Sequence, residues 1–415
     1  MSEDQMDVVT VQLTAMAHGG DALGRHEGKV IFVPYAIPGE TVRARIVEDK
    51  DHYAFASLVE VVEPSPDRVD PPCPYFGQGK CGGCQWQHIA YDAQLGLKAG
   101  ILVDQLERIG DLEAPRVHPT LPDETAWMYR NHAQFRPARG RGLGFQRASG
   151  DDVVAIDTCM ILHPLLSDLY GLIDLDVEGL IRLVLRAGTA TGDRLVGFEM
   201  ADDMPPALAS DEAVSCVLLL NQGGYANLVG DNAITEVVSG HSYRVSATSF
   251  FQVNVPQAAE LVRLAMAYLD LGGSETVLDA FCGVGLFTLP LAERADLVIG
   301  VESSPSAVDD LLDNTEGHDN IEIIEGVVED VMPEIAVPLD AALLDPPRAG
   351  IDRFALDALV GLGPERIVYV SCDPATLARD ARRLRSGGYR LVETQPVDMF
   401  PQTYHVESVS LFRAI

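Results

Sequence analysis

Two residues near the end of the chain have the side chains that covalent catalysis needs. Cys372, in the segment RIVYVSCDPATLARD, follows an expected strand and precedes an expected helix. Because the N-terminus of a helix has a positive potential that favours thiolate, we expect Cys372 to be a nucleophile. Glu407, in HVESVSLF, opens a last strand that we expect to return beside the one ending at Cys372. Its carboxylate would there serve as a proton acceptor.

A glycine turn earlier in the same region predicts a nucleoside site. The segment VLDAFCGVGLFTLPLA reads as strand, loop and helix, with Gly283 and Gly285 in the loop. Glu302 ends the next expected strand, where an acid can accept hydrogen bonds from ribose hydroxyls. The loop lacks the third glycine of a pyrophosphate-binding turn, so S-adenosylmethionine fits better than a dinucleotide. Asp345, in AALLDPPRAG, is expected at the same edge of the sheet, on a loop stiffened by prolines.

A third group of reactive side chains lies near the start of the chain, far in sequence from the residues named above. Cys73, Cys81 and Cys84 fall within the short segment CPYFGQGKCGGC. In a reducing compartment such a cluster is typical of a metal site rather than of disulfides. A closed tetrahedral site takes four ligands, so one must come from elsewhere. The candidates are Cys159, Cys216 and Cys282.

Three regions must position these residues. Short β-rich runs separated by Gly and Pro turns predict a small β-barrel over residues 1–63. A proline-rich boundary then leads into an α+β central region, residues 64–247. From residue 248 to 415, apolar strands alternate with helices, which predicts an α/β domain with an open, mostly parallel sheet.

Composition narrows the class of protein. The formal charge of −32 argues against a simple nucleic-acid binder, because phosphates are bound mainly by Lys and Arg. The segment from Arg130 to Arg147 is nonetheless rich in arginine and free of acids, with Phe135 and Phe145 interleaved. It is either a solvated rim or a strip that follows a nucleic-acid backbone and stacks bases. The acidic N-terminus and the short apolar runs predict neither a signal peptide nor a membrane span, and hence a cytoplasmic protein.

The motifs taken together resemble the RNA uridine-C5 methyltransferase family, whose members make 5-methyluridine in ribosomal and transfer RNA. The resemblance covers nearly the whole chain. It rests on GRHEGKVIFVPYAIPGE, CGGCQWQH, SFFQVN, DAFCGVGLFTL, DPPRAG, VYVSCDPATLARD and HVESVSLF, in that order. It implies an N-terminal TRAM RNA-binding barrel, a central iron–sulfur domain and a C-terminal Rossmann-like class I methyltransferase domain that uses S-adenosylmethionine.

The resemblance also implies roles for individual residues. The cofactor pocket would be lined by Gln252, Phe281, Glu302 and Asp345, beside the loop of Gly283 and Gly285. A 4Fe-4S cluster would be held by Cys73, Cys81, Cys84 and Cys159, although four thiolates also suit zinc. More residues separate Cys73 from Cys81 than is usual in the family, so the intervening loop must bulge.

The implied reaction is methylation of uracil C5 in RNA by a chain acting as a monomer. Cys372 would add to C6 and Glu407 would remove the C5 proton, with the flipped base near Phe250 or Phe251. Asp373 stands where asparagine is commoner, and its charge works against a thiolate at Cys372. We expect 23S ribosomal RNA as substrate, with transfer RNA as the alternative. An amino-group methyltransferase and a non-catalytic RNA-binding protein are the rival functions.

Overall fold

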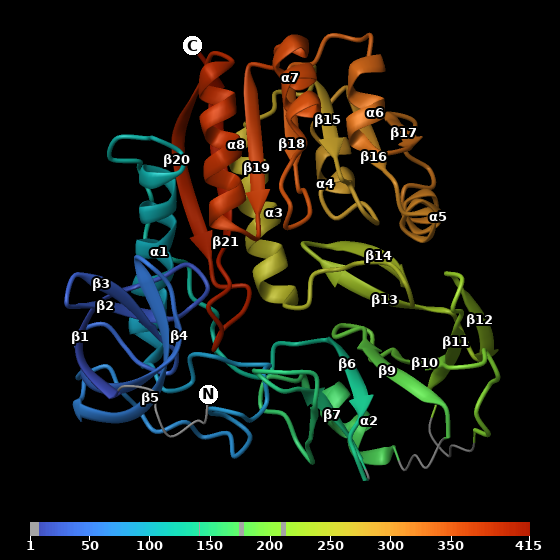
Figure 1. Ribbon diagram of the computed structural model, residues 1–415. Coiled ribbons are helices and arrows are strands. Elements are labelled where there is room, and N and C mark those ends of the chain that lie inside the picture. Colours follow the sequence, from blue (N-terminus) through green and yellow to red (C-terminus); the bar gives the residue numbers. More distant parts are fainter. Residues whose placement is uncertain (1–7, 141, 174–177, 209–212) are drawn as a thin grey trace.

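The first five strands close into the predicted barrel, drawn in blue in Figure 1. They are β1 (Val8–Met16), β2 (Ala22–His26), β3 (Lys29–Val33), β4 (Thr41–Asp49) and β5 (Tyr53–Glu63). Alternate side chains point inward, as a strand period of two requires, and Val11, Leu13 and Val42 are buried there. Antiparallel pairing of β1 with β4 closes the barrel.

The middle of the chain forms a mostly antiparallel sheet in the order β12-β11-β10-β9-β6-β7-β8. Its strands are β6 (His132–Pro137), β7 (Leu143–Gln146), β8 (Val153–Ala155), β9 (Leu180–Ala187), β10 (Arg194–Met200), β11 (Ser215–Leu219) and β12 (Tyr225–Val229). Helix α2 (Pro164–Leu172) packs on this sheet through Leu166 and Leu169. The hairpin of β13 (Ala233–Val238) and β14 (His241–Ser246) then leads into the last region.

The C-terminal region is the predicted open sheet, in the order β17-β16-β15-β18-β19-β21-β20. Its strands are β15 (Thr276–Ala280), β16 (Leu297–Glu302), β17 (Ile321–Glu325), β18 (Ala341–Leu344), β19 (Arg366–Ser371), β20 (Tyr389–Val397) and β21 (Glu407–Ala414). Pairing is parallel from β17 to β19, and β21 runs antiparallel to both of its neighbours.

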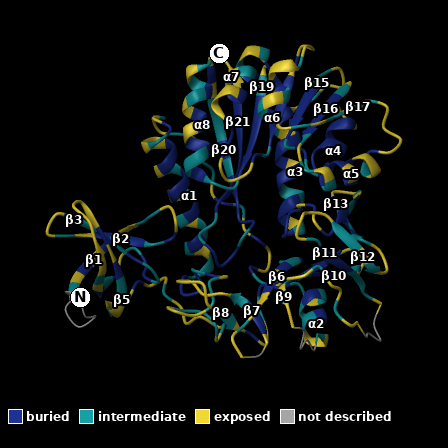
Figure 2. Cartoon of the chain, turned by 45° about the vertical axis from the view of Figure 1, so that its right-hand side comes forward, coloured by how far each residue is buried: buried dark blue, intermediate teal, exposed yellow. Residues whose placement is uncertain are grey.

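Helices cover both faces of this sheet (Figure 1). They are α3 (Val255–Leu269), α4 (Thr288–Ala292), α5 (Pro305–Asn314), α6 (Val328–Val331), α7 (Arg353–Leu362) and α8 (Pro374–Ser386), with a 3-10 turn at Met332–Glu334. Successive residues of β15 face opposite cores: Val277 packs with α3 and α4, and Leu278 packs with α7 and α8. Figure 2 shows the result as buried strands between helices whose outer faces are exposed.

Helix α1 (Tyr91–Arg108) belongs in sequence to the middle of the chain but packs on the C-terminal sheet. Leu102 and Leu106 share a buried cluster with Leu377 and Ala381 of α8, and α1 lies beside α8 in Figure 1. The core of the C-terminal region is therefore built partly from a segment far ahead of it in the chain.

The structure is a computed structural model and describes residues 8–140, 142–173, 178–208 and 213–415. Within those ranges, no helix combines the length and the apolar character needed to cross a membrane.

Candidate active site

The strand order reverses at β15, which has β16 on one side and β18 on the other. In open α/β sheets the carboxyl edge at such a point is where ligands bind. The loop after β15 carries Phe281, Gly283 and Gly285, Glu302 ends β16 and Asp345 follows β18. The topology thus brings these predicted cofactor residues to one edge of the sheet.

Backbone conformation explains the glycines of the loop. Phe281, Gly283 and Gly285 all have positive φ, at 64°, 57° and 97°, a region that glycine enters without cost. A Cβ on Gly285 would lie 2.8 Å from Cδ1 of Leu311. The Gly285 N–H donates to the Cys282 carbonyl at 2.9 Å, which closes the turn.

Glu302 is held by the backbone around it. One carboxylate oxygen accepts from the Gly283 N–H at 2.9 Å, and the other accepts from the N–H groups of Ser303 and Ser304 at 2.8 and 2.7 Å. Bonds of this kind hold the carboxylate group in one orientation. The oxygen bonded to Gly283 accepts only this one bond and retains a lone pair, so Glu302 is a prepositioned acceptor for a hydroxyl group.

Two further acids lie at this edge: Asp279 is buried and Asp345 is half-buried. Burial raises the pKa of Asp279 to about 7, with Glu302 adding to the rise and the hydroxyl of Thr288, 2.6 Å away, opposing it. Burial and the charge of Asp279 raise the pKa of Asp345 to about 7. The Oδ1 atom of Asp279 has no hydrogen-bond partner in the described part of the protein. These carboxyls therefore take up protons near neutral pH.

The raised pKa of Asp345 predicts a pH dependence of stability. A carboxyl whose pKa rises from 3.8 to about 7 on folding contributes stability that is fully present below 3.8 and lost as the pH climbs through 7. The midpoint temperature of thermal unfolding, measured without ligand, is expected to fall as the pH rises from 3.8 to about 7. We expect this fall to be less steep in the Asp345→Asn protein than in the native protein. Equal slopes would show that Asp345 has an ordinary pKa in the folded chain.

Cys372 follows β19 directly and precedes α8, as predicted. Asp373 caps α8 by accepting from the N–H groups of Ala375 and Thr376, both at 2.9 Å. The direction of the thiol pKa, however, is opposite to the one expected from the helix start. Burial, followed by the charges of Glu407 and Asp345, raises the pKa of Cys372 to about 12. Desolvation and nearby acids outweigh the helix dipole, and the resting group is a thiol.

Glu407 lies next to Cys372 because of strand pairing. Ser371 of β19 pairs with Ser408 of β21 in antiparallel register, so Cys372 and Glu407 form the next opposed positions. Glu407 is 2% exposed. Burial, and then the charge of Asp345, raise the pKa of Glu407 well above its usual range.

Sequence reasoning assigned no role to Arg348, which lies on the Asp345 loop. Its charge opposes the rise in the pKa values of Cys372 and Glu407. A guanidinium nitrogen of Arg348 lies 3.5 Å from Nδ1 of His405, whose ring packs on Phe400 and Tyr404. Burial, and then Arg348, lower the pKa of His405 to about 4, so His405 is neutral and orients the loop. The sequence feature that could have identified Arg348 is its position three residues after Asp345.

The barrel also reaches the catalytic edge. Nε2 of His18, in the β1–β2 turn, lies 3.4 Å from a carboxylate oxygen of Asp373. In the same turn, the Gly20 carbonyl accepts from the indole of Trp86 at 3.1 Å. An RNA held on the barrel would therefore pass close to Cys372.

Only one of the two phenylalanines considered for base stacking is available. Phe251 is buried and packs against Tyr243, with ring centroids 5.7 Å apart. Phe250 is 69% exposed. Gln252 is buried, three residues before the first residue of α3.

In the arginine-rich segment from Arg130 to Arg147, Phe135 is not placed as the base-stacking interpretation predicted. Phe135 stacks on both Phe145 and Tyr170, with centroids 4.8 and 4.6 Å apart, and is fully buried. It is not free to stack bases, because alternate residues of β6 face the core of the middle sheet. Arg136 is exposed, whereas the Arg147 guanidinium donates to the Gly79 carbonyl at 2.6 Å. Arg141 lies outside the described residues.

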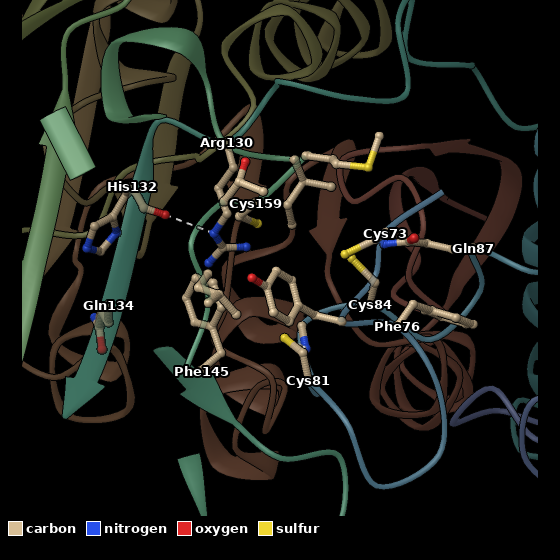
Figure 3. A pocket seen from close by; sticks show the side chains of 16 residues that line it. Cys73, Phe76, Cys81, Cys84, Gln87, Arg130, His132, Gln134, Phe145 and Cys159 are labelled. Carbon is tan, nitrogen blue, oxygen red and sulfur yellow. Dashed lines mark hydrogen bonds between the residues drawn. The ribbon is translucent and has the colours of Figure 1, made fainter. Parts of the chain in front are cut away.

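The four cysteines named as cluster ligands line one cavity of about 370 Å³. Figure 3 shows Cys73, Cys81, Cys84 and Cys159 around this space, with Cys159 beside Arg130 and across from Cys73 and Cys84. Cys216 lies on β11 and Cys282 in the glycine loop, so Cys159 is the cysteine that joins the three. Burial raises the pKa of Cys84 to about 12 and that of Cys159 to about 11. Among the described residues, no three His, Cys, Asp or Glu side chains form a group that could hold a metal ion.

Comparisons with known proteins identify the family of this chain. Residues 234–414 match the family model described as tRNA (Uracil-5-)-methyltransferase, and residues 5–59 match the TRAM domain. An RNA methyltransferase of Halalkalibacterium halodurans is 38% identical over 98% of this chain and 96% of its own length. One from Gloeobacter violaceus is 37% identical over 98% of this chain and 96% of its own length.

A solved structure resembles the whole chain. The Pyrococcus abyssi tRNA (uracil-54, C5)-methyltransferase, in complex with S-adenosyl-L-homocysteine, is 28% identical, with a TM-score of 0.77. The alignment covers 97% of this chain and all of that one. The chain is thus a member of the RNA uracil-5-methyltransferase family and carries an N-terminal TRAM domain.

Proposed function

We propose that this protein methylates C5 of uracil in RNA by covalent catalysis, with Cys372 as nucleophile and Glu407 as base. The observation that carries the proposal is the register of β19 and β21, which sets Cys372 opposite Glu407 at the edge that also holds Asp345. A thiol beside a buried carboxyl suits a reaction in which one group adds to a ring and the other removes a proton.

The cofactor proposed for the glycine loop is S-adenosylmethionine. The residues fit this group, because Glu302 is a fixed acceptor for ribose hydroxyls and the loop backbone is free of side chains at Gly283 and Gly285. The related Pyrococcus enzyme was solved with the demethylated product of this cofactor. When bound, the cofactor supplies an electrophilic methyl group. Gln252 and Phe281 are proposed to complete the pocket.

The protein's own residues account for the remaining steps. The Cys372 thiol loses its proton to solvent, and the resulting thiolate adds to C6 of uracil. The displaced electron pair makes C5 nucleophilic. After C5 has been methylated, the Glu407 carboxylate removes its proton. The electrons of that C–H bond restore the double bond between C5 and C6, and the C6–S bond breaks to release the thiolate. Arg348 is the cation that favours the charged forms of both residues.

Two classes of RNA are candidate substrates. We favour 23S ribosomal RNA because of the proposed iron–sulfur cluster, and transfer RNA is the second candidate because the Pyrococcus neighbour acts on uracil 54 of tRNA. Mass-spectrometric mapping of 5-methyluridine in cells with and without the gene decides between them. Loss of 5-methyluridine from a 23S position supports 23S ribosomal RNA as the substrate, and loss from tRNA selects the alternative. No loss from either RNA refutes the proposed methyltransferase function.

A 4Fe-4S cluster is proposed for the cavity of Cys73, Cys81, Cys84 and Cys159. All-thiolate ligation by four cysteines suits such a cluster. When bound, it would tie the segment of Cys73, Cys81 and Cys84 to the loop of Cys159.

Removing one ligand tests the cluster. The Cys159→Ala protein, purified without oxygen, is expected to lose most of its iron and acid-labile sulfide. Cys216→Ala serves as the control, because Cys216 lies on β11 outside the cavity. Equal iron contents in both variants would contradict the assignment, and zinc in the native protein would replace it.

A methyl group on Gly285 is expected to weaken cofactor binding. Ala at a φ of 97° is strained, and its Cβ would press on Leu311 at 2.8 Å, which should reduce affinity for S-adenosylhomocysteine by about tenfold or more. Isothermal titration calorimetry measures the change. Gly361→Ala in α7 is the matched control, because open space surrounds its Cα. Unchanged affinity in Gly285→Ala would place the cofactor elsewhere.

A further inference from the structure

The loop between β20 and β21, residues 398–406, delivers Glu407 to the active site. We call it the base loop. It holds no helix or strand, yet most of its residues are buried. Its start is fixed by Lys98 of α1, whose ammonium donates to Asp398 at 2.5 Å and to the Phe400 carbonyl at 3.0 Å. Its middle is held by a different part of the chain.

Gln402 is the centre of that second attachment. Its φ of 69° places a non-glycine residue in the left-handed region, which costs energy unless neighbours fix it. The Gln402 carbonyl accepts from the backbone N–H groups of Gln85 and Trp86 at 3.1 and 3.0 Å. Both residues follow Cys84 in the cysteine-rich segment.

A buried amide pair reinforces the contact. The Gln94 side chain donates to the side-chain oxygen of Gln402 at 3.0 Å, and its own oxygen accepts from the Gln402 N–H at 3.1 Å. The same Gln94 amide nitrogen donates to the carbonyls of Trp86 and Ile89 at 3.2 and 3.0 Å. Gln94 and Gln402 are 1% and 4% exposed, so losing either partner leaves buried polar groups unsatisfied.

A second link leads from the cysteine cavity to the residue before Gln402. Tyr129 packs in one small cluster with Cys84 and Ile161, and its hydroxyl donates to the Pro401 carbonyl at 3.1 Å. Two neighbouring residues of the base loop are therefore bonded to groups that contact or directly follow Cys84. A shift of Cys84 would be transmitted to both.

We propose that Gln402 is a positioning residue through which the cysteine-rich segment sets Glu407 against Cys372, so that the state of the four cysteines governs proton removal from C5. The inference rests on the proposed function. Its physical basis is that a strained, buried residue keeps its conformation only while its partners hold it. Release of Gln402 would let the base loop relax and move Glu407, while Cys372, on the β19–α8 turn, would stay in place.

The test uses the full-length protein and the variants Gln402→Gly and Gln94→Leu. Glycine accepts the backbone conformation at position 402, so only the amide is removed. With an ordinary uracil transcript we expect turnover to fall by roughly 10- to 100-fold, while a detergent-stable covalent RNA adduct accumulates. The double variant should be no worse than Gln94→Leu alone, because that variant already removes the amide–amide contact that Gln402→Gly removes. Gln395→Leu is the control: its amide bonds the Pro119 and Pro396 carbonyls but not the cysteine segment, and its kinetics should match the native ones.

Hydrogen exchange gives a readout that does not depend on activity. Amides of residues 398–406 should exchange faster in Gln402→Gly and in Cys84→Ser, with β15 and β18 unchanged. Native exchange in both variants, or a fall in turnover without any adduct, would overturn the inference. If the native protein forms no adduct even with a 5-fluorouridine transcript, it is the proposed function that fails.

Discussion

The Cys372→Ala protein is expected to transfer no methyl group to RNA. Uracil C5 is a poor nucleophile until a group has added to C6, and Cys372 is the thiol at the sheet edge that also carries Asp345 and Glu407. Losing an enzyme's nucleophile can cost about 10⁶-fold in rate, so activity should fall to background. Transfer of labelled methyl groups to a uracil transcript measures the loss.

Two controls separate this result from a folding defect. The Cys372→Ala protein should still bind S-adenosylhomocysteine, because the glycine loop and Glu302 are untouched. Cys216→Ala removes a half-buried cysteine on β11 and should remain active. Full methyl transfer by Cys372→Ala would refute covalent catalysis and favour the amino-group mechanism, which needs no thiol.

The Glu407→Gln protein is expected to stop after methylation with RNA still attached. Glutamine is close to isosteric with glutamate, so Cys372 can still add to C6, but the C5 proton has no acceptor. General-base removal contributes about 10²- to 10⁴-fold, and turnover should fall by that amount. Gel electrophoresis in detergent should reveal a covalent adduct on an ordinary uracil transcript.

Glu393→Gln is a matched control for this change. Glu393 lies on β20, which pairs with the strand that carries Glu407, and its carboxylate contacts His118 at 2.6 Å instead of the catalytic edge. The Glu393→Gln protein should methylate the uracil transcript at the native rate and accumulate no covalent adduct. If Glu407→Gln also turns over normally, a different residue takes the proton.

The raised pKa of Cys372 bears on both experiments. The resting thiol, with a pKa of about 12, is protected from oxidation because thiolate is the reactive form. Within the described residues, Arg348 is the cation that opposes this rise. The rate of adduct formation with a 5-fluorouridine transcript should therefore increase with pH across the neutral range.

The sequence by itself determined the parts of this protein that depend on local pattern. Alternating apolar runs and turn residues predicted the barrel and the parallel sheet, because strand and helix periods are visible in neighbouring residues. The glycine loop, Glu302, Asp345 and Cys372 were found because each follows a strand, and the carboxyl ends of parallel strands share one edge. The resemblance rested on those same short motifs.

Only the tertiary structure decided which distant residues meet. Four thiols share a cavity because loops far apart in sequence converge there, and no local pattern distinguishes Cys159 from Cys216 or Cys282. The burial of Phe135 and the packing of α1 on α8 likewise depend on partners far away in sequence.

The thiol pKa was misjudged for the same reason. A helix start is visible in the sequence, but the desolvation of Cys372 and the closeness of Glu407 arise from the fold. The attachment of Gln402 to the cysteine-rich segment joins residues about three hundred positions apart. Contacts over such separations are selected by the packing of the whole chain, and that packing sets the geometry and charge of the site.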